Sequence, residues 1–483
     1  MTDERTLLLE NASPKNSVFG GDVNIQEALQ KDIPETDEEK KLLRKIDLRL
    51  MPIIWVMYIL NFVDRTNIGN AKIAGMPGDL GLDDSQFAWA LSVFFVGYLM
   101  MEVPSFDISP SYHVGLGCSQ CCHGWYPYLQ GIGRFPVRPG CIEAGFFPGV
   151  LYLLYCWYKP AEIGKRFAIF FSAAVLAGAF GGLLAGAITQ KIADFHGISS
   201  WRWLFIIEGV ATVCVAIVAK FILFDFPSTS PTLSLEERQL TTVRLLAAGV
   251  ESSSHHDGNR LNHWQAFVAT VSDYRTFLFM FICVCIIGAA TIQFFIPTIT
   301  VALGYETVAA QYMTIPIYII AAIFLNIAAV SADRLQERRW HVTISLALAC
   351  SAAVVCVIVT NPIVRYIMLC FVVSGIWTSI PLVFAWMSEI INIPAEKRAV
   401  CLALVNSVAN LSSVFGSRLW PSSTAPHYTF GWAVTAGCLG FAAVTAVLIP
   451  VVLKSIPPYV TKAERELQDR KDAMGADAQS SEA

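Results

Sequence analysis

Long apolar runs separated by short polar loops dominate the chain from about residue 50 onward. A bilayer core of about 30 Å is crossed by about 20 mostly apolar helical residues, because each residue adds 1.5 Å. Backbone N–H and C=O groups in lipid must be paired within the segment, so these runs are expected to be helices. The pattern predicts an all-α, polytopic membrane protein. Eleven runs stand out, at residues 50–71, 86–104, 138–158, 167–189, 203–224, 276–298, 312–331, 341–360, 364–387, 399–421 and 430–453.

Basic residues indicate which loops stay in the cytosol, because short loops rich in Lys and Arg are retained there. Both tails are also basic next to their spans, which predicts cytosolic termini. Two cytosolic termini require an even number of spans, so a twelfth is expected between Ser105 and Gly140. That stretch is crowded with Gly, Pro and Tyr, and at best it is a poor span. The basic loops contain Lys159/Lys165/Arg166, Arg334/Arg338/Arg339 and Lys397/Arg398.

One long polar segment divides the predicted spans into six and six. The halves echo each other in sequence: Glu162, Lys165 and Arg166 precede FAIFFSAAVLAGAFGG, and Glu396, Lys397 and Arg398 precede AVCLALVNSVANLSSVFG. Duplicated halves are typical of transporter folds, and chance similarity between two small-residue helices is the alternative. We predict twelve helices in two pseudo-symmetric halves. The expected layout is a disordered cytosolic tail (1–45), an N-terminal half (46–224), a cytosolic central loop (225–275), a C-terminal half (276–455) and a second cytosolic tail (456–483).

Composition limits the classes of function that the protein is expected to have. The chain is 55% hydrophobic and 15% charged, against roughly 25% charged in soluble domains. The net charge of -4 gives no basic excess, so we expect no nucleic-acid partner. Most of the 13 cysteines lie singly in apolar runs. CSQCCH (118–123) has no second ligand pair at zinc spacing, so no metal, no cofactor and no enzymatic activity are expected.

Ionisable residues inside apolar runs are the candidates for chemistry, because burying a charge in lipid is costly. Asp64 and Arg65 lie about 21 Å from the cytosolic start of the first span, and Glu143 lies about 23 Å from the cytosolic end of its own span. Burial raises a carboxylate pKa and a guanidinium lowers it, so an anion arriving beside Arg65 could switch proton occupancy. A purely structural ion-pair network is the alternative.

Other polar residues suggest gating and substrate contact. Asp333, Arg334, Arg338 and Arg339 form a D-R-x-x-x-R-R loop that could pair with a helix end in one conformation and release it in another, or could simply anchor the loop. The same gating role is assigned to the charged residues at the start of the two similar segments: Glu162, Lys165, Arg166, Glu396, Lys397 and Arg398. Candidate substrate contacts beside Arg65 are Asn61, Gln293 and Asn406, and helix-to-helix hydrogen bonds are equally compatible with these amides.

Several segments together resemble a known family. They are KIDLRLMPIIWVMYILNFVDRTNIGNAKIAG, DLGLDDSQFAWALSVFFVGYLMMEVPS, EAGFFPGVLYLLYCWY, GKRFAIFFSAAVLAGAFGG and WRWLFIIEG. They are similar to fungal allantoate, nicotinate and pantothenate permeases, in the anion:cation symporter branch of the major facilitator superfamily. The resemblance covers about residues 40–470 and is stronger in the first half. It implies a plasma-membrane, proton-coupled importer of carboxylate nutrients, with Asp64 and Glu143 as protonation sites and Arg65 facing the substrate's negative charge.

The resemblance breaks between Ser105 and Ile142, where the family has a third span, a basic loop and R-F-x-L-G-x-x-E-A-G. Pro136 stands where the family has Arg. A one-base frame shift allows Arg at 136, Phe at 137, Leu at 139 and Gly at 140. We therefore expect residues of about 106–142 to be a frameshifted or mis-spliced translation, which an in-frame transcript would disprove.

The favoured function is alternating-access symport of a small organic anion with a proton, by a protein that we expect to be monomeric in the lipid bilayer. Two alternatives stay open. One is a non-transporting or defective relative, such as a nutrient sensor, which would show no pH-dependent accumulation of any anion. The other is an exporter of a small metabolite, which would show outward flux without proton dependence.

Overall fold

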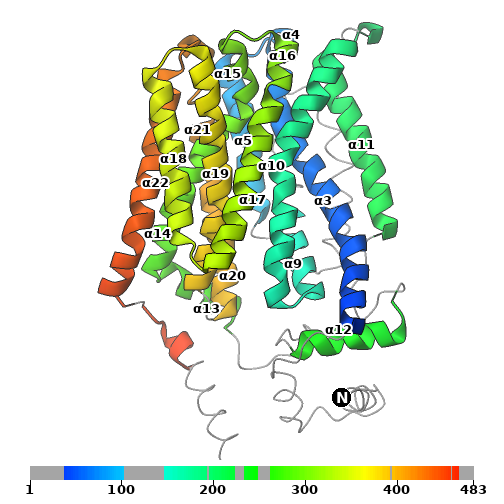
Figure 1. The fold of residues 1–483 in the computed structure, drawn as a ribbon, viewed down its shortest axis with the longest axis vertical. Coiled ribbons are helices and arrows are strands. Elements are labelled where there is room, and N and C mark those ends of the chain that lie inside the picture. The colour runs from blue at the N-terminus through cyan, green and yellow to red at the C-terminus, as the bar shows by residue number, and fades with distance from the viewer. Residues whose placement is uncertain are drawn as a thin grey trace, which may run out of the picture.

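The computed structural model describes residues 37–102, 146–192, 195–222, 233–247, 261–391, 394–457 and 459–466. Regular structure in these ranges is entirely helical. Long helices run side by side from one end of the molecule to the other (Figure 1). We call the end that carries α12 (Leu235–Ala247) the α12 face and the end that carries α4 (Met76–Leu80) the α4 face.

The N-terminal half contains five described long helices. They are α3 (Asp37–Ile73), α5 (Asp84–Glu102), α9 (Phe146–Trp157), α10 (Pro160–Lys191) and α11 (Ser200–Ile222). The expected third span and the frame-shift hypothesis fall on residues outside the described ranges, as does Glu143.

The C-terminal half follows α13 (His263–Val271) and starts with a seventh span made of three pieces: α14 (Tyr274–Ala290), the 3-10 helix η3 (Thr291–Phe294) and α15 (Ile296–Ala302). Short α16 (Thr307–Tyr312) precedes the next long helix. The remaining helices are α17 (Thr314–Leu335), α18 (Arg339–Ile358), α19 (Pro362–Ile390), α20 (Ala395–Leu411), α21 (Ser413–Gly416) and α22 (Thr429–Ser455).

In the part of the chain that the structure describes, each of the eleven apolar runs coincides with one or more of these helices. Nine helical segments in the described part of the chain are long and apolar enough to cross a membrane. Polar residues define several helix starts, as expected where the first backbone N–H groups lack helical partners. Asp273 caps α14 by accepting from the N–H of Arg275, and Asn361 caps α19 by accepting from the N–H of Ile363.

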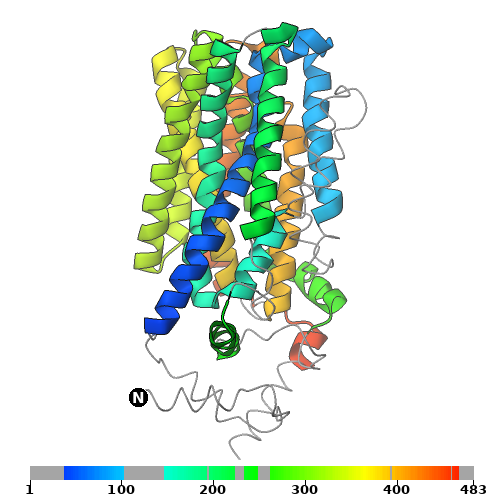
Figure 2. The same ribbon diagram turned by 90° about the vertical axis from the view of Figure 1, so that its right-hand side faces the viewer.

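The central segment contains more regular structure than the polar loop that was predicted. It holds α12 and α13, which lie across the α12 face rather than through the bundle (Figure 2). Thr241, Arg244 and Leu245 of α12 are buried, whereas Leu235 is exposed. The buried residues at positions 241, 244 and 245 share one face of the helix, so α12 packs through that face although most of its sequence is polar.

The two halves contact each other mainly toward the α4 face. There α10 packs on α16 and α17, α3 packs on η3 and α15, and α5 packs on α20 and α21. Glycines permit the approach of α10: a Cβ on Gly178 would lie 2.3 Å from the ring of Tyr318, and one on Gly182 would lie 2.0 Å from Thr314 Oγ1. By contrast, the ion pairs described at the α12 face join groups within one half or between a half and its flanking segment.

Candidate functional site

Arg65 lies where the N-terminal half faces its partner. It is eight residues from the end of α3 at Ile73, which places it about 12 Å below the α4 face. Its guanidinium carbon lies 5.2 Å from the ring centroid of Phe62, 5.7 Å from that of Phe94 and 4.8 Å from that of Tyr98. Rings at these distances attract a cation through their negative faces, most strongly where water is scarce. Asp64, the preceding residue, is half-buried like Arg65.

The rings around Arg65 reach the other half of the molecule. Phe62 packs edge-on against Trp377 of α19, with 6.0 Å between ring centroids. Phe171 of α10 approaches the same indole at 6.3 Å. Arg65 is therefore separated from the C-terminal half by a single aromatic layer, so a change in the distance between the halves would alter its surroundings.

Two predicted substrate contacts have buried oxygens that accept no hydrogen bond in the described structure: Asn61 Oδ1 on α3 and Gln293 Oε1 on η3. Because η3 packs on α3 around Gly69, Gln293 belongs to the surface between the halves. Asn61 is the neighbour of Phe62, whose ring contacts Trp377 of the other half. An unpaired buried amide oxygen is costly and is commonly satisfied by water or a ligand. Asn406 is half-buried on α20, and its backbone oxygen accepts from Asn410 Nδ2 at 3.0 Å.

A buried carboxylate that was not singled out from the sequence lies nearby in the N-terminal half. Glu208 of α11 is 1% exposed and accepts a hydrogen bond from Asn67 Nδ2 of α3. Asn67 Oδ1 in turn accepts from Asn70 Nδ2 at 3.1 Å. The rule that drew attention to Asp64, an acid inside an apolar run, applies equally to Glu208 in WRWLFIIEG.

The D-R-x-x-x-R-R loop lies between α17 and α18, and its arginines contact α19 and α22. Arg338 pairs with Glu389 of α19 at 2.5 Å and with Asp333 at 3.1 Å. Arg339 donates to the backbone oxygen of Val447 in α22 at 3.0 Å. Arg334 is exposed near the α12-face end of α17. The predicted pairing with a neighbouring helix end is present in this conformation, and its release in another conformation stays a prediction.

At the α12 face of the N-terminal half, four charges form one cluster, which we call the N cluster: Glu39, Lys159, Glu162 and Arg244. Lys159 Nζ lies 2.6 Å from Glu39 Oε1, and Arg244 of α12 bonds Glu162 and approaches Glu39 at 3.4 Å. Beside this cluster, Arg166 binds Asp47 through two bonds of 2.7 and 2.8 Å. The side chain of Lys165 lies outside the described structure.

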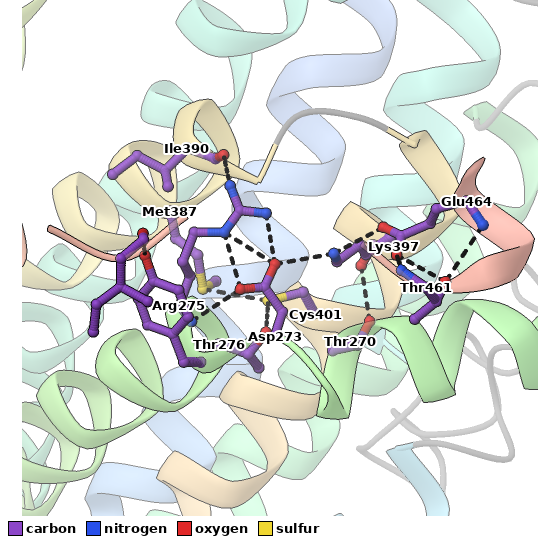
Figure 3. Close-up of polar contacts among 12 residues, drawn as sticks. Thr270, Asp273, Arg275, Thr276, Met387, Ile390, Lys397, Cys401, Thr461 and Glu464 are labelled. Atoms are coloured by element: carbon purple, nitrogen blue, oxygen red, sulfur yellow. Dashed lines mark hydrogen bonds and ion pairs between the residues drawn. The ribbon is translucent and has the colours of Figure 1, made fainter. Parts of the chain in front are cut away.

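The C-terminal half has an equivalent cluster, the C cluster, formed by Asp273, Arg275, Lys397 and Glu464 (Figure 3). Lys397 is 1% exposed, and its ammonium lies 2.9 Å from Asp273 and 2.8 Å from Glu464. Arg275 binds Asp273 at 2.6 Å. Burial alone would raise the pKa of Asp273, but hydrogen bonds from Arg275 and Lys397 outweigh it and lower that pKa. Glu396 and Arg398, the neighbours of Lys397, are half-buried.

In the described part of the chain, no three His, Cys, Asp or Glu residues lie together as a group that could hold a metal ion. The CSQCCH segment lies outside that part. The clusters at the α12 face instead pair acids with bases, which suits holding segments together rather than catalysis.

Comparison with known proteins agrees with this architecture. Residues 139–417 match the family model described as Major Facilitator Superfamily. An uncharacterized transporter of Schizosaccharomyces pombe is 30% identical, with 94% of this chain and 95% of that protein covered. A protein of Agrobacterium vitis named as a candidate tartrate transporter is 28% identical, with 88% of this chain and 94% of that protein covered.

Solved structures show the same fold. The proton:xylose symporter XylE bound to 6-bromo-6-deoxy-D-glucose superposes with a TM-score of 0.63 at 15% identity, covering 88% of this chain and 99% of that one. A bacterial homologue of the human lysosomal transporter Spinster, in an inward-facing and unoccupied conformation, gives 0.59 at 13% identity, covering 93% and 99%. The chain is therefore an integral membrane transporter, not an enzyme, and it belongs to the major facilitator superfamily.

Proposed function

We propose that the protein imports a small organic anion together with a proton by alternating access, with Arg65 as the anion-binding group. The observation that carries the proposal is the position of Arg65, deep in the bundle, ringed by Phe62, Phe94 and Tyr98, one aromatic layer from the other half. A planar guanidinium binds a carboxylate through two parallel hydrogen bonds, which a ring face cannot provide.

The aromatic surroundings explain how binding could be reversible. Ring faces contribute to the stabilisation of Arg65 between transport steps. An arriving carboxylate would offer a stronger partner, and Asn61 and Gln293 would bring amide groups from both halves to the same substrate. Asn406 of α20 would add a further contact from the C-terminal half.

Proton coupling is assigned to Asp64, with Glu143 as a second protonation site. Asp64 is adjacent to Arg65, so an anion that engages the guanidinium weakens its effect on the carboxylate and favours proton uptake. The resemblance to the anion:cation symporter branch implies the same roles for Asp64 and Glu143. The tartrate name of the Agrobacterium vitis relative also supports a carboxylate substrate.

The orientation of the protein in the membrane is assigned from its basic loops. The α12 face carries the basic loops that contain Lys159, Arg338 and Lys397, so we assign it to the cytosol and the α4 face to the outside, with both termini cytosolic in the plasma membrane. Contacts between the halves concentrate toward the α4 face. In this assignment the structure corresponds to a state that is closed toward the outside.

The decisive experiment is uptake by the full chain in proteoliposomes with an inward proton gradient, screened over tartrate, nicotinate, allantoate and pantothenate. With the accepted anion, Arg65→Lys should lower kcat/KM by about tenfold to a hundredfold, because the lysine ammonium cannot form the bidentate pair. Arg202→Lys is the matched control, since Arg202 also lies over a ring, Trp201, but outside the site. Unchanged uptake by Arg65→Lys would refute the assignment of Arg65.

Asp64→Asn separates coupling from binding. The variant should still exchange labelled for unlabelled anion across the membrane, because the guanidinium is intact, but it should not accumulate the anion against a gradient. Acid-driven accumulation at the wild-type level would exclude Asp64 as the coupling group. Outward flux that ignores the proton gradient would instead indicate an exporter, and no flux of any anion would favour the non-transporting alternative.

A further inference from the structure

An ion pair lies at the outer end of the N-terminal half. Lys72, in the last turn of α3, is 3.4 Å from Asp84 at the first residue of α5. The side chain of Lys72 is 10% exposed and that of Asp84 is 38% exposed, so the pair lies at the edge of the buried surface between the halves.

Asp84 reaches across to the C-terminal half. Its Oδ2 accepts from the backbone N–H of Ser422 at 2.8 Å, and its Oδ1 accepts from the Ser422 hydroxyl at 2.8 Å. Ser422 starts a short 3-10 turn, η4 (Ser422–Thr424), between α21 and α22. One carboxylate thus bonds a lysine of its own half and two donors of the other half.

Lys72 makes a second connection between the halves. Its ammonium lies 4.7 Å from the ring centroid of Phe87 on α5 and 5.3 Å from that of Phe295, which follows η3 in the C-terminal half. Phe87 and Phe295 also contact each other edge-on at 6.3 Å. Separating the halves at the α4 face would break both Asp84 bonds to Ser422 and would withdraw Phe295 from the ammonium.

We propose that Lys72, Asp84 and Ser422 form the latch of the gate at the α4 face and hold it closed until the carrier reopens on that side. The lysine orients the carboxylate from within one half, and the carboxylate binds the opposite half. This role is independent of the substrate and of proton coupling, because it requires only that the two halves separate at this face during the cycle, as in alternating access.

A serine pair provides a direct reporter of this closure. Ser92 Oγ of α5 and Ser417 Oγ, just beyond α21, are 3.0 Å apart, and both side chains are buried. Ser92 lies eight residues, or about 12 Å, along α5 from Asp84, so the two contacts are separate points on one interface. The double variant Ser92→Cys/Ser417→Cys should form a disulfide only while the α4 face is closed.

The test compares disulfide formation in this double variant with and without Asp84→Asn, using full-length protein in liposomes without substrate and with a protease site inserted in the central loop. The single-cysteine variants correct for native cysteines. Asn keeps one acceptor but loses the charge, so disulfide formation should slow about threefold to tenfold. Labelling of Ser417→Cys by a membrane-impermeant thiol reagent should rise in parallel.

Asp83→Asn is the matched control, because Asp83 is the adjacent acid and bonds Gln86 within its own half. Ser422→Ala, which removes the hydroxyl but keeps the N–H, should give a smaller change than Asp84→Asn. Equal disulfide rates in the Asp84→Asn and Asp83→Asn variants, both monodisperse after purification, would overturn the latch. Because these readouts need no substrate, their failure is distinguishable from failure of the anion-symport proposal.

Discussion

The N cluster and the C cluster place the same charges in different arrangements. Each has two acids and two bases, and each takes one charge from the segment that follows its half. Arg244 comes from α12, after the last helix of the first half, and Glu464 comes from the tail after α22. The charge supplied by the following segment has the opposite sign in the two clusters: it is a cation in the first half and an anion in the second half.

The difference follows from which group is buried in each half. In the C cluster the central group is a lysine with 1% exposure, so the tail must supply a carboxylate. In the N cluster Glu39, with 2% exposure, already has Lys159 beside it, and the linker adds a second cation. Each cluster thus pairs two acids with two bases, although the flanking segment supplies a cation in one half and an anion in the other.

Lys397→Met should have the largest effect. It leaves Asp273 with Arg275 alone and removes the cation from Glu464, and breaking a buried pair in this way costs about 3–5 kcal/mol. The expected result is a clear fall in apparent melting temperature in detergent. Lys454→Met, on an exposed lysine of α22, should change stability by less than about 0.5 kcal/mol.

A double variant sharpens this test. Lys397→Met/Glu464→Gln removes the cation and one of its two acids together, so it should recover part of the lost stability. If the double variant is as unstable as Lys397→Met, or less stable, the tail carboxylate does not act through Lys397, and the proposed equivalence with the N cluster is wrong.

Arg244→Met should have an intermediate effect, about 1–3 kcal/mol, because Glu162 loses its partner while Glu39 keeps Lys159. Thermal unfolding followed by a thiol-reactive dye measures the loss. Glu236→Gln, on the same helix and exposed, is the control. A loss as large as that of Lys397→Met would show that the remaining lysine does not compensate.

Glu237→Gln should have the smallest effect, about 0–1 kcal/mol, since its pair with Lys45 at 2.8 Å is partly exposed. The hydrogen bond from Lys45 lowers the pKa of Glu237. Stabilisation is therefore present above the unfolded pKa of about 4.3 and is lost as the pH falls through the lower folded pKa. The melting temperature of the variant should depend less on pH below about pH 5 than that of the parent, and an identical pH profile would exclude the pair.

The helical spans were predictable because lipid forces long apolar runs into helices, and the eleven runs coincide with the helices observed. Asp64 and Arg65 lie within the long helix that the sequence predicts for them, and their depth in a bilayer stays a prediction from the rise per residue. The echo of Glu162 and Glu396 correctly indicated duplicated halves, but not that Lys397 would be buried. Contacts between distant residues, such as Asp84 and Ser422, which are 338 residues apart, depend on how the helices pack. A hydropathy pattern does not contain that information.

The glycines of α10 have a consequence for motion. At Gly178 and Gly182, Tyr318 and Thr314 occupy the spaces that a Cβ would need, so the two helices approach closely. Such a close contact between the halves can serve as a pivot, because no α10 side chain separates the two helices at these positions. A methyl group at Gly182 would push α10 away from Thr314 and keep the two halves apart at the α4 face. The carrier would then favour the conformation that is open on that side.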